Sequence, residues 1–164
     1  MNNDLTVEIV KDDALRFLDE LSGVIGKARA SALRKGANII KAQTQTSLSA
    51  TGIAYDKQNP KYTDRLVDGI RVTSIKDDDT IGVHIMGSRS SGSGTFRLRF
   101  FEKGTKDRYA KTYKGAPLKK KKRLGKIKSY RFFSSAITTS KSAATQAMTE
   151  QLTKYIDKAW NNYN

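Results

Sequence analysis

Few residues of this 164-residue chain have side chains suited to catalysis or metal binding. Cysteine is absent, which excludes disulfides, thiolate metal sites and a cysteine nucleophile. The single histidine, His84, lies in the alternating segment 81–86, on the opposite face from Val83 and Ile85. No serine and acid at suggestive spacing accompany it as a catalytic triad would require. We therefore interpret His84 as an exposed strand residue and not as a catalytic base.

The acidic residues give no clearer site. Consecutive acids at residues 77–79 could bind a hard cation, but they lack the glycine-spaced pattern of a calcium loop. Glu102 could join Asp64 or Asp68 in a nuclease-like carboxylate cluster, although no spacing singles these acids out. The glycine-containing stretches match neither a phosphate loop nor a dinucleotide turn. We expect no catalytic residue, no cofactor and no metal, and a protein that is not an enzyme.

Charge is the strongest compositional signal, with 31 Lys and Arg residues against 16 Asp and Glu and a net charge of +15. Residues 97–131 hold 15 of the basic residues and only two acids, so this segment carries +13 and the rest of the chain +2. Such an asymmetry indicates a polyanion or an acidic protein surface as the partner.

Within that segment, seven basic side chains are candidates for contact with DNA or with a partner protein. They are Lys119, Lys120, Lys121, Lys122, Arg123, Lys126 and Lys128. Tyr109, Tyr113 and Tyr130 are interleaved with them and could stack on bases or pack against the fold. A solvated surface loop is the other interpretation of the same residues, and the sequence leaves both open.

The first third of the chain predicts a short strand followed by helices. Residues 5–10 alternate between apolar and polar types, which is typical of a half-buried strand. Asp12 and Asp13 would then supply the N-cap and first-turn acids of a helix. A second helical stretch covers residues 24–48, with a break expected at residues 22–23.

The middle of the chain predicts a sheet. Residues 49–64 have little periodicity and are expected to form a loop, and residues 88–94 a flexible connector. Alternation in residues 70–75 and 81–86 favours a β-hairpin. Residues 96–101 alternate again and are expected to form a third strand that ends at Gly104.

The last third predicts a flexible basic loop at residues 105–130 and a long helix. Apolar residues recur every three or four positions from Phe133 to Trp160, and we expect Leu152 and Ile156 to pack this helix across the sheet. The expected fold is a single α+β domain over residues 1–164, with an antiparallel sheet of three to four strands packed by N-terminal helices and a long C-terminal helix.

Membrane association and secretion are not expected. No apolar run approaches the roughly 18 residues of a membrane span. The first residues lack the basic region of a secretory signal. We expect a soluble protein made in a reducing cytoplasm.

Four short motifs, in a fixed order, carry a family resemblance. They are Arg34-Lys35-Gly36-Ala37, Thr51-Gly52, the turn Phe100-Phe101-Glu102-Lys103-Gly104-Thr105, and Phe132-Phe133-Ser134-Ser135-Ala136 at the start of the long helix. With the elements between them, they make the chain similar to the small minor tail and head–tail joining proteins of long-tailed phages and prophages, the lambda-like tail-completion family. The resemblance covers residues 5–105 and 130–160, and its most specific part is the turn motif Phe101, Glu102, Gly104 and Thr105.

The resemblance implies a structural role at the head–tail junction of a virion, as a tail-completion or minor tail component assembled in the host cytoplasm. It implies a homo-oligomeric ring, with a hexamer expected, between the portal–connector assembly and the tail tube. A ring of this kind surrounds the path of the genome, so a DNA contact in its lumen is expected. The alternative from another class is a stand-alone nucleic-acid-binding protein that uses the basic segment 97–131.

Two residues of the turn motif have expected structural roles. Gly104 follows a strand and precedes a polar segment, so we expect it to have a positive φ. Glu102 is expected to cap or pair locally, near Lys103 or Arg108, and a catalytic role is the less favoured alternative.

Overall fold

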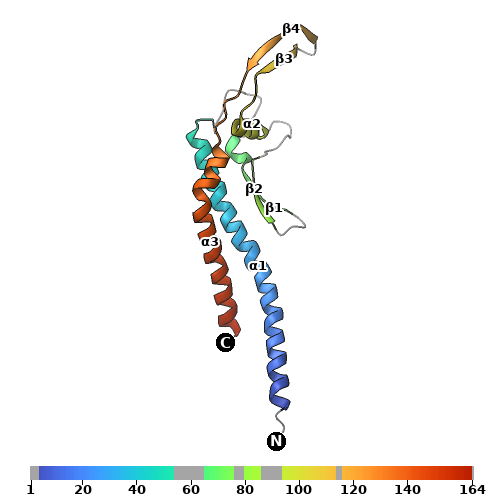
Figure 1. Cartoon of the computed structure of the whole chain (residues 1–164), viewed down its shortest axis with the longest axis vertical. Coiled ribbons are helices and arrows are strands. Elements are labelled where there is room, and N and C mark those ends of the chain that lie inside the picture. The colour runs from blue at the N-terminus through green and yellow to red at the C-terminus, as the bar shows by residue number, and fades with distance from the viewer. Residues whose placement is uncertain (1–3, 54–64, 76–79, 86–93, 114–115, 164) are drawn as a thin grey trace.

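The computed structural model describes residues 4–53, 65–75, 80–85, 94–113 and 116–163. Two long helices lie side by side, and β-hairpins and short helical segments surround one end of this pair (Figure 1). The α+β class predicted from the sequence is confirmed. Among the described helices, none combines the length and apolar character needed to cross a membrane.

Nine elements make up the described part of the chain. In sequence order they are α1 (Asp4–Ala50), η1 (Leu66–Gly69), β1 (Arg71–Ile75), β2 (Thr80–His84), η2 (Thr95–Arg97), α2 (Leu98–Lys103), β3 (Arg108–Tyr113), β4 (Ala116–Gly125) and α3 (Phe132–Tyr163). The short elements η1, η2 and α2 lie near the end of the helix pair at which α1 ends and α3 begins (Figure 1).

Small residues allow α1 and α3 to approach closely. Ala28 and Ala32 on α1 and Ala144 on α3 are each 2% exposed. A Cβ atom built on Gly36 would lie 2.7 Å from Cγ of Met148, so this position has room only for glycine unless Met148 moves. The helices run in opposite directions (Figure 1). Close backbone contact along a seam of small side chains explains why this helix pair can be long without large core residues.

The strands form two separate antiparallel hairpins, so the expected sheet of three to four strands is divided in two. β1 pairs with β2 from Arg71 opposite His84 to Ile75 opposite Thr80, as the sequence predicted. β3 pairs with β4 in a second two-stranded sheet. The first hairpin packs beside the middle of α1, whereas the second projects from the end of the molecule (Figure 1).

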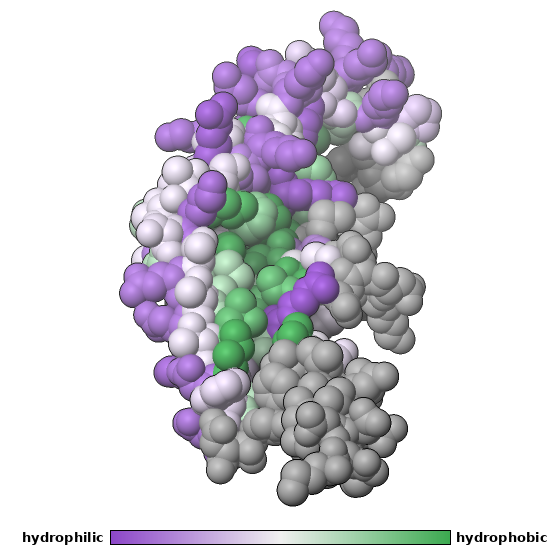
Figure 2. Space-filling model, turned by 60° about the horizontal axis from the view of Figure 1, so that its bottom comes forward, coloured by the Kyte–Doolittle hydropathy of each residue, from purple (hydrophilic) through white to green (hydrophobic). Residues whose placement is uncertain are grey.

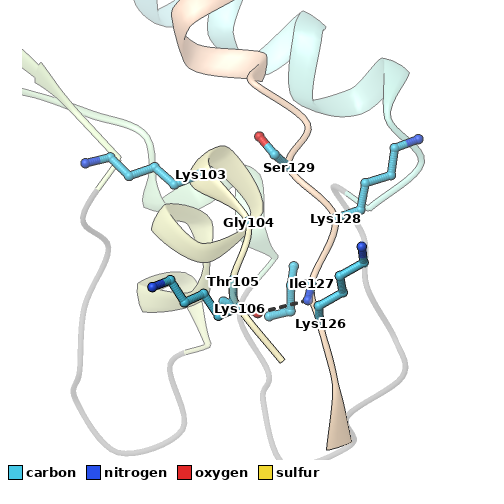
Figure 3. Close-up of a pocket in the computed structure, with 8 residues that line it drawn as sticks. All are labelled: Lys103, Gly104, Thr105, Lys106, Lys126, Ile127, Lys128 and Ser129. Atoms are coloured by element: carbon cyan, nitrogen blue, oxygen red, sulfur yellow. Dashed lines mark hydrogen bonds between the residues drawn. The ribbon is translucent and has the colours of Figure 1, made fainter. Parts of the chain in front are cut away.

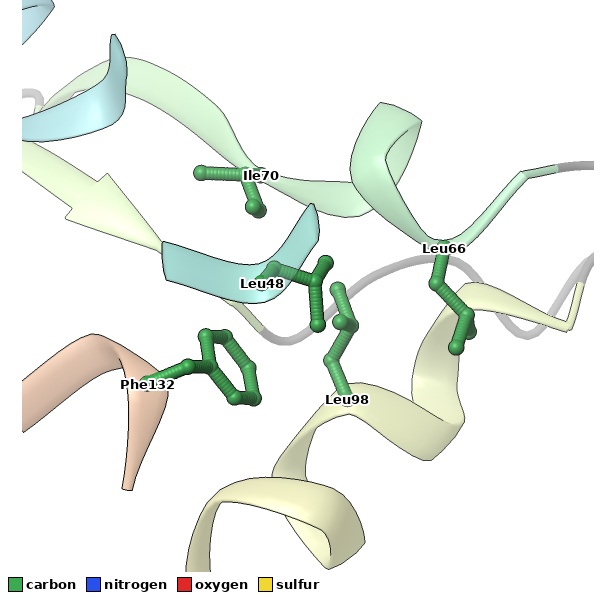
Figure 4. Packing of buried hydrophobic residues seen from close by; sticks show 5 residues of the cluster. All are labelled: Leu48, Leu66, Ile70, Leu98 and Phe132. Atoms are coloured by element: carbon green, nitrogen blue, oxygen red, sulfur yellow. The ribbon is translucent and has the colours of Figure 1, made fainter. Parts of the chain in front are cut away.

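One compact cluster of large side chains holds the elements together. Its five members come from four segments of the chain and converge in Figure 4: Leu48, Leu66, Ile70, Leu98 and Phe132. Each is at most 2% exposed. This core lies where α1 ends and α3 begins, so it fixes the geometry of that end of the molecule.

The strand expected at residues 5–10 is wrong, because α1 is already helical from Asp4. Asp12 and Asp13 therefore lie inside a helix and not at its cap, and the helix passes through residues 22–23 without a break. Alternation over six residues also satisfies a helix when apolar residues fall three or four positions apart, as Leu5 and Ile9 do. Because these residues continue directly into a long helix, the helical conformation is the one adopted and not the strand.

The third strand expected at residues 96–101 is also wrong. This segment forms η2 and then α2, with Leu98 fully buried and Glu102 only 6% exposed. Residues 98 and 102 are one helical turn apart, so the helix points both of them inward. The alternation of aromatic and basic residues concealed this spacing.

The loop expected at residues 105–130 contains the β3–β4 hairpin. Tyr109 and Thr112 are among the residues that favour strands. These preferences outweigh the depletion of lysine from strands, because the lysines of β4 lie in solvent and cost nothing by burial. The flexibility expected for this segment stays a prediction.

The C-terminal helix is confirmed as α3, but the packing predicted for it is not. α3 packs along α1, and Leu152 and Ile156 are 37% and 53% exposed. Other expectations lie outside the described residues: most of the loop at 49–64, the acids at 77–79 and the connector at 88–93.

Candidate functional site

Glu102 holds the start of α3, although it belongs to α2. One carboxylate oxygen, Oε2, accepts a hydrogen bond from the backbone N–H of Phe133 at 2.8 Å. The other, Oε1, accepts from the N–H and the hydroxyl of Ser134, at 3.0 and 2.6 Å. The first turn of α3 has no acid of its own, so Glu102 supplies the negative charge that favours a helix N-terminus.

Backbone contacts tie the same two segments together. The N–H of Tyr130 donates to the carbonyl of Phe101 at 2.8 Å, and the hydroxyl of Ser129 donates to the carbonyl of Glu102 at 2.7 Å. The rings of Phe101 and Tyr130 meet edge to face, 6.3 Å apart. We call this assembly of residues 101–105 with residues 127–134 the joint.

Gly104 makes the turn within the joint. Its φ is +71°, as the sequence predicted, and a Cβ atom there would lie 3.0 Å from both the carbonyl oxygen of Ile127 and the N–H nitrogen of Ser129. Thr105 follows and exchanges two hydrogen bonds with Ile127, one through its hydroxyl at 2.9 Å and one through its N–H at 3.1 Å. All four residues of the turn motif thus have structural tasks.

The expectation that Glu102 caps is confirmed, but the expected partners, Lys103 and Arg108, are wrong. The partners are Phe133 and Ser134, some thirty residues later in the chain. One sequence signal could have found them: a long helix that begins without an acid needs one from elsewhere.

A basic pocket of about 650 Å³ opens beside the joint. It is lined by residues 103–106 and 126–129, and it brings Lys103 and Lys106 near Lys126 and Lys128. In Figure 3 the first two side chains extend to one side of the pocket and the last two to the other. The sequence singled out Lys126 and Lys128 as contact candidates but not Lys103, which lies within the turn motif, or Lys106, which follows it.

The other five candidate cations lie on β4, away from this pocket. Lys119, Lys120, Lys121, Lys122 and Arg123 are all exposed. Arg123 pairs with Asp107 across the hairpin at 3.0 Å. The seven candidates therefore form two groups, one on the projecting hairpin and one at the pocket.

The tyrosines among these cations divide in the same way. Tyr130 packs in the joint against Phe101, with the Lys128 ammonium 5.7 Å from its ring centroid. Tyr109 on β3 is 51% exposed and free to stack on an external group. The side chain of Tyr113 lies outside what the structure describes.

The acidic and histidine candidates for catalysis are not brought together. Asp68 pairs with Arg65 at 3.1 Å, whereas Glu102 is engaged in the joint. His84 is half-buried at the end of β2 and lies over Gly82, which corrects its expected exposure. Within the described part of the chain, no three His, Asp or Glu residues cluster as a metal site would need. Asp64 lies outside that part.

An apolar groove of about 280 Å³ opens between α1, β2 and α3. It is lined by Leu33, Gly36, Ala37, Ile40, Ile81, Val83, Phe133, Ile137 and Met148. Figure 2 shows apolar side chains gathered in a strip on one face of the molecule, with polar side chains along one side of it. An exposed apolar groove of this kind marks an interaction surface more often than a catalytic one.

Comparisons with family models, with curated proteins and with solved structures each find no match to this chain.

Proposed function

We propose that this chain is a structural protein of the head–tail junction of a long-tailed phage or prophage. In this role it is a tail-completion or minor tail component that forms a homo-oligomeric ring between the connector and the tail tube. It is not an enzyme, it uses no cofactor, and it acts in the virion after assembly in the host cytoplasm. Its partners are copies of itself, the portal–connector proteins and the tail-tube protein.

The observation that carries this proposal is the joint. The turn motif and the Phe-Phe-Ser-Ser-Ala motif are separate in sequence, yet Glu102 bonds directly to Phe133 and Ser134. Two of the four motifs that carry the resemblance are thus a single structural unit. A carboxylate that is 6% exposed and accepts three hydrogen bonds is suited to holding a fold together and poorly suited to proton transfer.

Exposed apolar side chains support assembly. Leu152 and Ile156 on α3 are 37% and 53% exposed, and an apolar groove opens between α1, β2 and α3. Large apolar side chains that gather on a surface mark a place where a partner binds.

Deletion tests the proposed role. A phage that lacks this chain is expected to produce heads and tails that fail to join, which electron micrographs of lysates would count. Adding the purified protein to such a lysate is expected to restore infectious particles. Intact virions formed in the absence of the protein would overturn the proposal.

A second candidate function is stand-alone nucleic-acid binding, and the basic hairpin favours it. Four consecutive lysines and Arg123 are exposed on β4, and Tyr109 is exposed on the neighbouring strand. Exposed cations with an aromatic side chain beside them are typical of single-strand-binding surfaces.

Salt dependence separates the two candidates. If the hairpin binds DNA, replacing Lys119, Lys120, Lys121, Lys122 and Arg123 with Ser should flatten the dependence of affinity on salt, because fewer counterions are released. A monomer that binds DNA tightly favours the second candidate, whereas an oligomer with weak DNA affinity favours the first. Light scattering and DNA titration at low and high salt measure both properties.

A further inference from the structure

The two long helices separate at the end that lies away from the core. Gln151 still donates to the Ser31 hydroxyl at 3.1 Å, and Lys35 donates to the Gln151 carbonyl at 3.5 Å. Beyond this point the helices diverge (Figure 1). We call the diverging ends, α1 before Ser31 and α3 after Gln151, the fork.

Large apolar side chains of the fork are partly exposed. Ile25, Leu152, Ile156 and Trp160 are 51%, 37%, 53% and 57% exposed. On α3, residues 148, 152, 156 and 160 follow one another at intervals of four, so this stripe continues from Met148 in the apolar groove. The groove and the α3 side of the fork therefore form one apolar surface.

The first part of α1 extends past the helix that packs against it. From the contact between Gln151 and Ser31, α3 continues for twelve residues to Tyr163, whereas α1 continues for 27 residues back to Asp4. About 15 residues of α1 thus reach beyond the end of α3, which Figure 1 shows. We call residues 4–20 the N-terminal arm.

The N-terminal arm has the sequence of an amphipathic helix. At helical spacing, one face carries a set of five apolar residues, and the charged residues fall on the other face together with Leu5, Ile9 and Leu15. The set consists of Val7, Val10, Ala14, Phe17 and Leu18. An amphipathic helix of this kind binds an apolar groove through anchors three or four residues apart.

Length and charge match the arm to the groove. The arm is about 25 Å long, and the α3 wall of the groove from Phe133 to Met148 is about 22 Å long, at 1.5 Å per helical residue. The arm carries six acids and two bases, a net charge of −4. Residues 22–50 of α1 carry five bases and no acid.

Basic side chains also border the groove. Arg29 and Arg34 line a neighbouring cavity that shares Ile81 with the groove. Lys141 is exposed on α3, one turn after Ile137 of the groove wall. The charge on the arm and the charge around the groove are therefore complementary.

We propose that the N-terminal arm of one copy binds in the apolar groove of a second copy, with its apolar face against Ile137 and Met148 and its acids toward the basic border. The contact rests on the homo-oligomer of the proposed function and names the surfaces that build it. Arm and groove are different surfaces, so each copy keeps one of each for another neighbour. Such a head-to-tail contact closes into a ring or continues as a filament.

Two substitutions test this contact, one in the N-terminal arm and one in the groove. Phe17→Asp charges the apolar face of the arm, and Ile137→Asp charges the groove, where this side chain is already 39% exposed. We expect each variant alone to be monomeric in sedimentation velocity, at concentrations where the wild-type chain forms larger species. Unchanged circular dichroism would show that each variant remains folded.

Mixing the two variants gives the sharper result. The Phe17→Asp chain keeps an intact groove, and the Ile137→Asp chain keeps an intact arm, so the mixture is expected to form one-to-one dimers and nothing larger. The matched control is Ile9→Asp, the same change on the charged face of the arm, which should leave the wild-type assembly in place. Trp160, the only tryptophan, should emit at shorter wavelength in assembled protein than in either variant alone.

The outcomes separate this contact from the function on which it rests. Oligomers that survive Phe17→Asp, or a mixture that stays monomeric, would overturn the contact and leave the head–tail role standing. A wild-type chain that stays monomeric at every concentration would overturn the contact and the homo-oligomer together. The phage deletion experiment decides the head–tail role independently.

Discussion

The two ends of the helix pair differ in how completely the chain covers them. At the end where α1 ends and α3 begins, five large side chains are buried together. In the joint at the same end, the carboxylate of Glu102 accepts three hydrogen bonds. At the fork, Leu152, Ile156 and Trp160 are 37%, 53% and 57% exposed. One end is closely packed, whereas the other presents apolar side chains that are only partly covered.

This difference indicates that some apolar side chains are buried by the chain itself, whereas others are left for a partner to cover. Natural chains rarely keep a stripe of large apolar residues exposed unless a partner covers it. We therefore expect the joint and the core to matter for stability, whereas the fork and the apolar groove are the surfaces that we propose for assembly. Substitutions at the two ends should separate stability from assembly.

The largest effect on the free energy of unfolding is expected from a comparison of substitutions at Leu98 and Leu152. Leu98→Ala removes a fully buried side chain from the core and should lower the free energy of unfolding by about 2–5 kcal/mol. Leu152→Ala, at 37% exposure, should cost under about 1 kcal/mol in the monomer but weaken assembly. Chemical denaturation at low protein concentration measures both. Equal losses would mean that the two ends contribute alike to the stability of the monomer.

The next effect concerns Glu102. Glu102→Ala leaves the N–H groups of Phe133 and Ser134 without their acceptor and should cost about 2–3 kcal/mol. The matched control is Glu150→Ala on the exposed side of α3, where the carboxylate accepts only from Gln146 and the cost should stay within about 0.5 kcal/mol. Thermal melting would register the first change as a drop of about 4–10 °C. A melting temperature like that of the control would show that the joint does not need this carboxylate.

A smaller effect compares two glycines. Gly104→Val should destabilise the chain by about 1–3 kcal/mol, because φ is +71° and the new side chain meets Ile127 and Ser129. Gly23→Ala lies inside α1, with nothing within 4 Å of its new Cβ, and should stabilise the helix by up to about 1 kcal/mol. Opposite signs in denaturant titrations are the expected result. Two changes of the same sign would contradict the backbone argument at one of the sites.

The smallest effect on folding is expected at the basic hairpin. Replacing Lys119, Lys120, Lys121, Lys122 and Arg123 with Ser alters exposed side chains and one exposed ion pair, so each change should cost within about 0.5 kcal/mol. Melting temperatures of the wild-type and substituted chains should nearly coincide. A large drop would place the hairpin among the elements that hold the fold together.

Sequence periodicity correctly predicted the elements in which apolar residues recur at the spacing of the secondary structure. The hairpin of β1 and β2 and the long α3 helix both appear where the spacing of apolar residues placed them. The strand expected at residues 96–101 was wrong because its alternation depended on Arg97 and Arg99, which are half-buried in the structure, while the burial of Leu98 and Glu102 follows a helical turn. Tertiary contacts decided that element, and they are not visible in a six-residue window.

The candidate site was predicted in part for a similar reason. The turn of Gly104 and the capping role of Glu102 follow from local rules and were anticipated. The partners of Glu102 follow from the meeting of segments about thirty residues apart, which spacing alone does not encode. The exposure of Leu152 and Ile156 was missed because an apolar stripe has the same sequence whether its own chain or another copy covers it.

The pairing of α1 with α3 has a consequence for synthesis on the ribosome. Ser31 and Gln151 are 120 residues apart, so α1 emerges long before the helix that packs against it. At about 5–20 residues per second, the interval lasts on the order of ten seconds. During this time the seam of Ala28, Ala32 and Gly36 has no partner helix. The contact between the two helices therefore forms only after α3 has emerged, when the earlier parts of the chain are already available to fold.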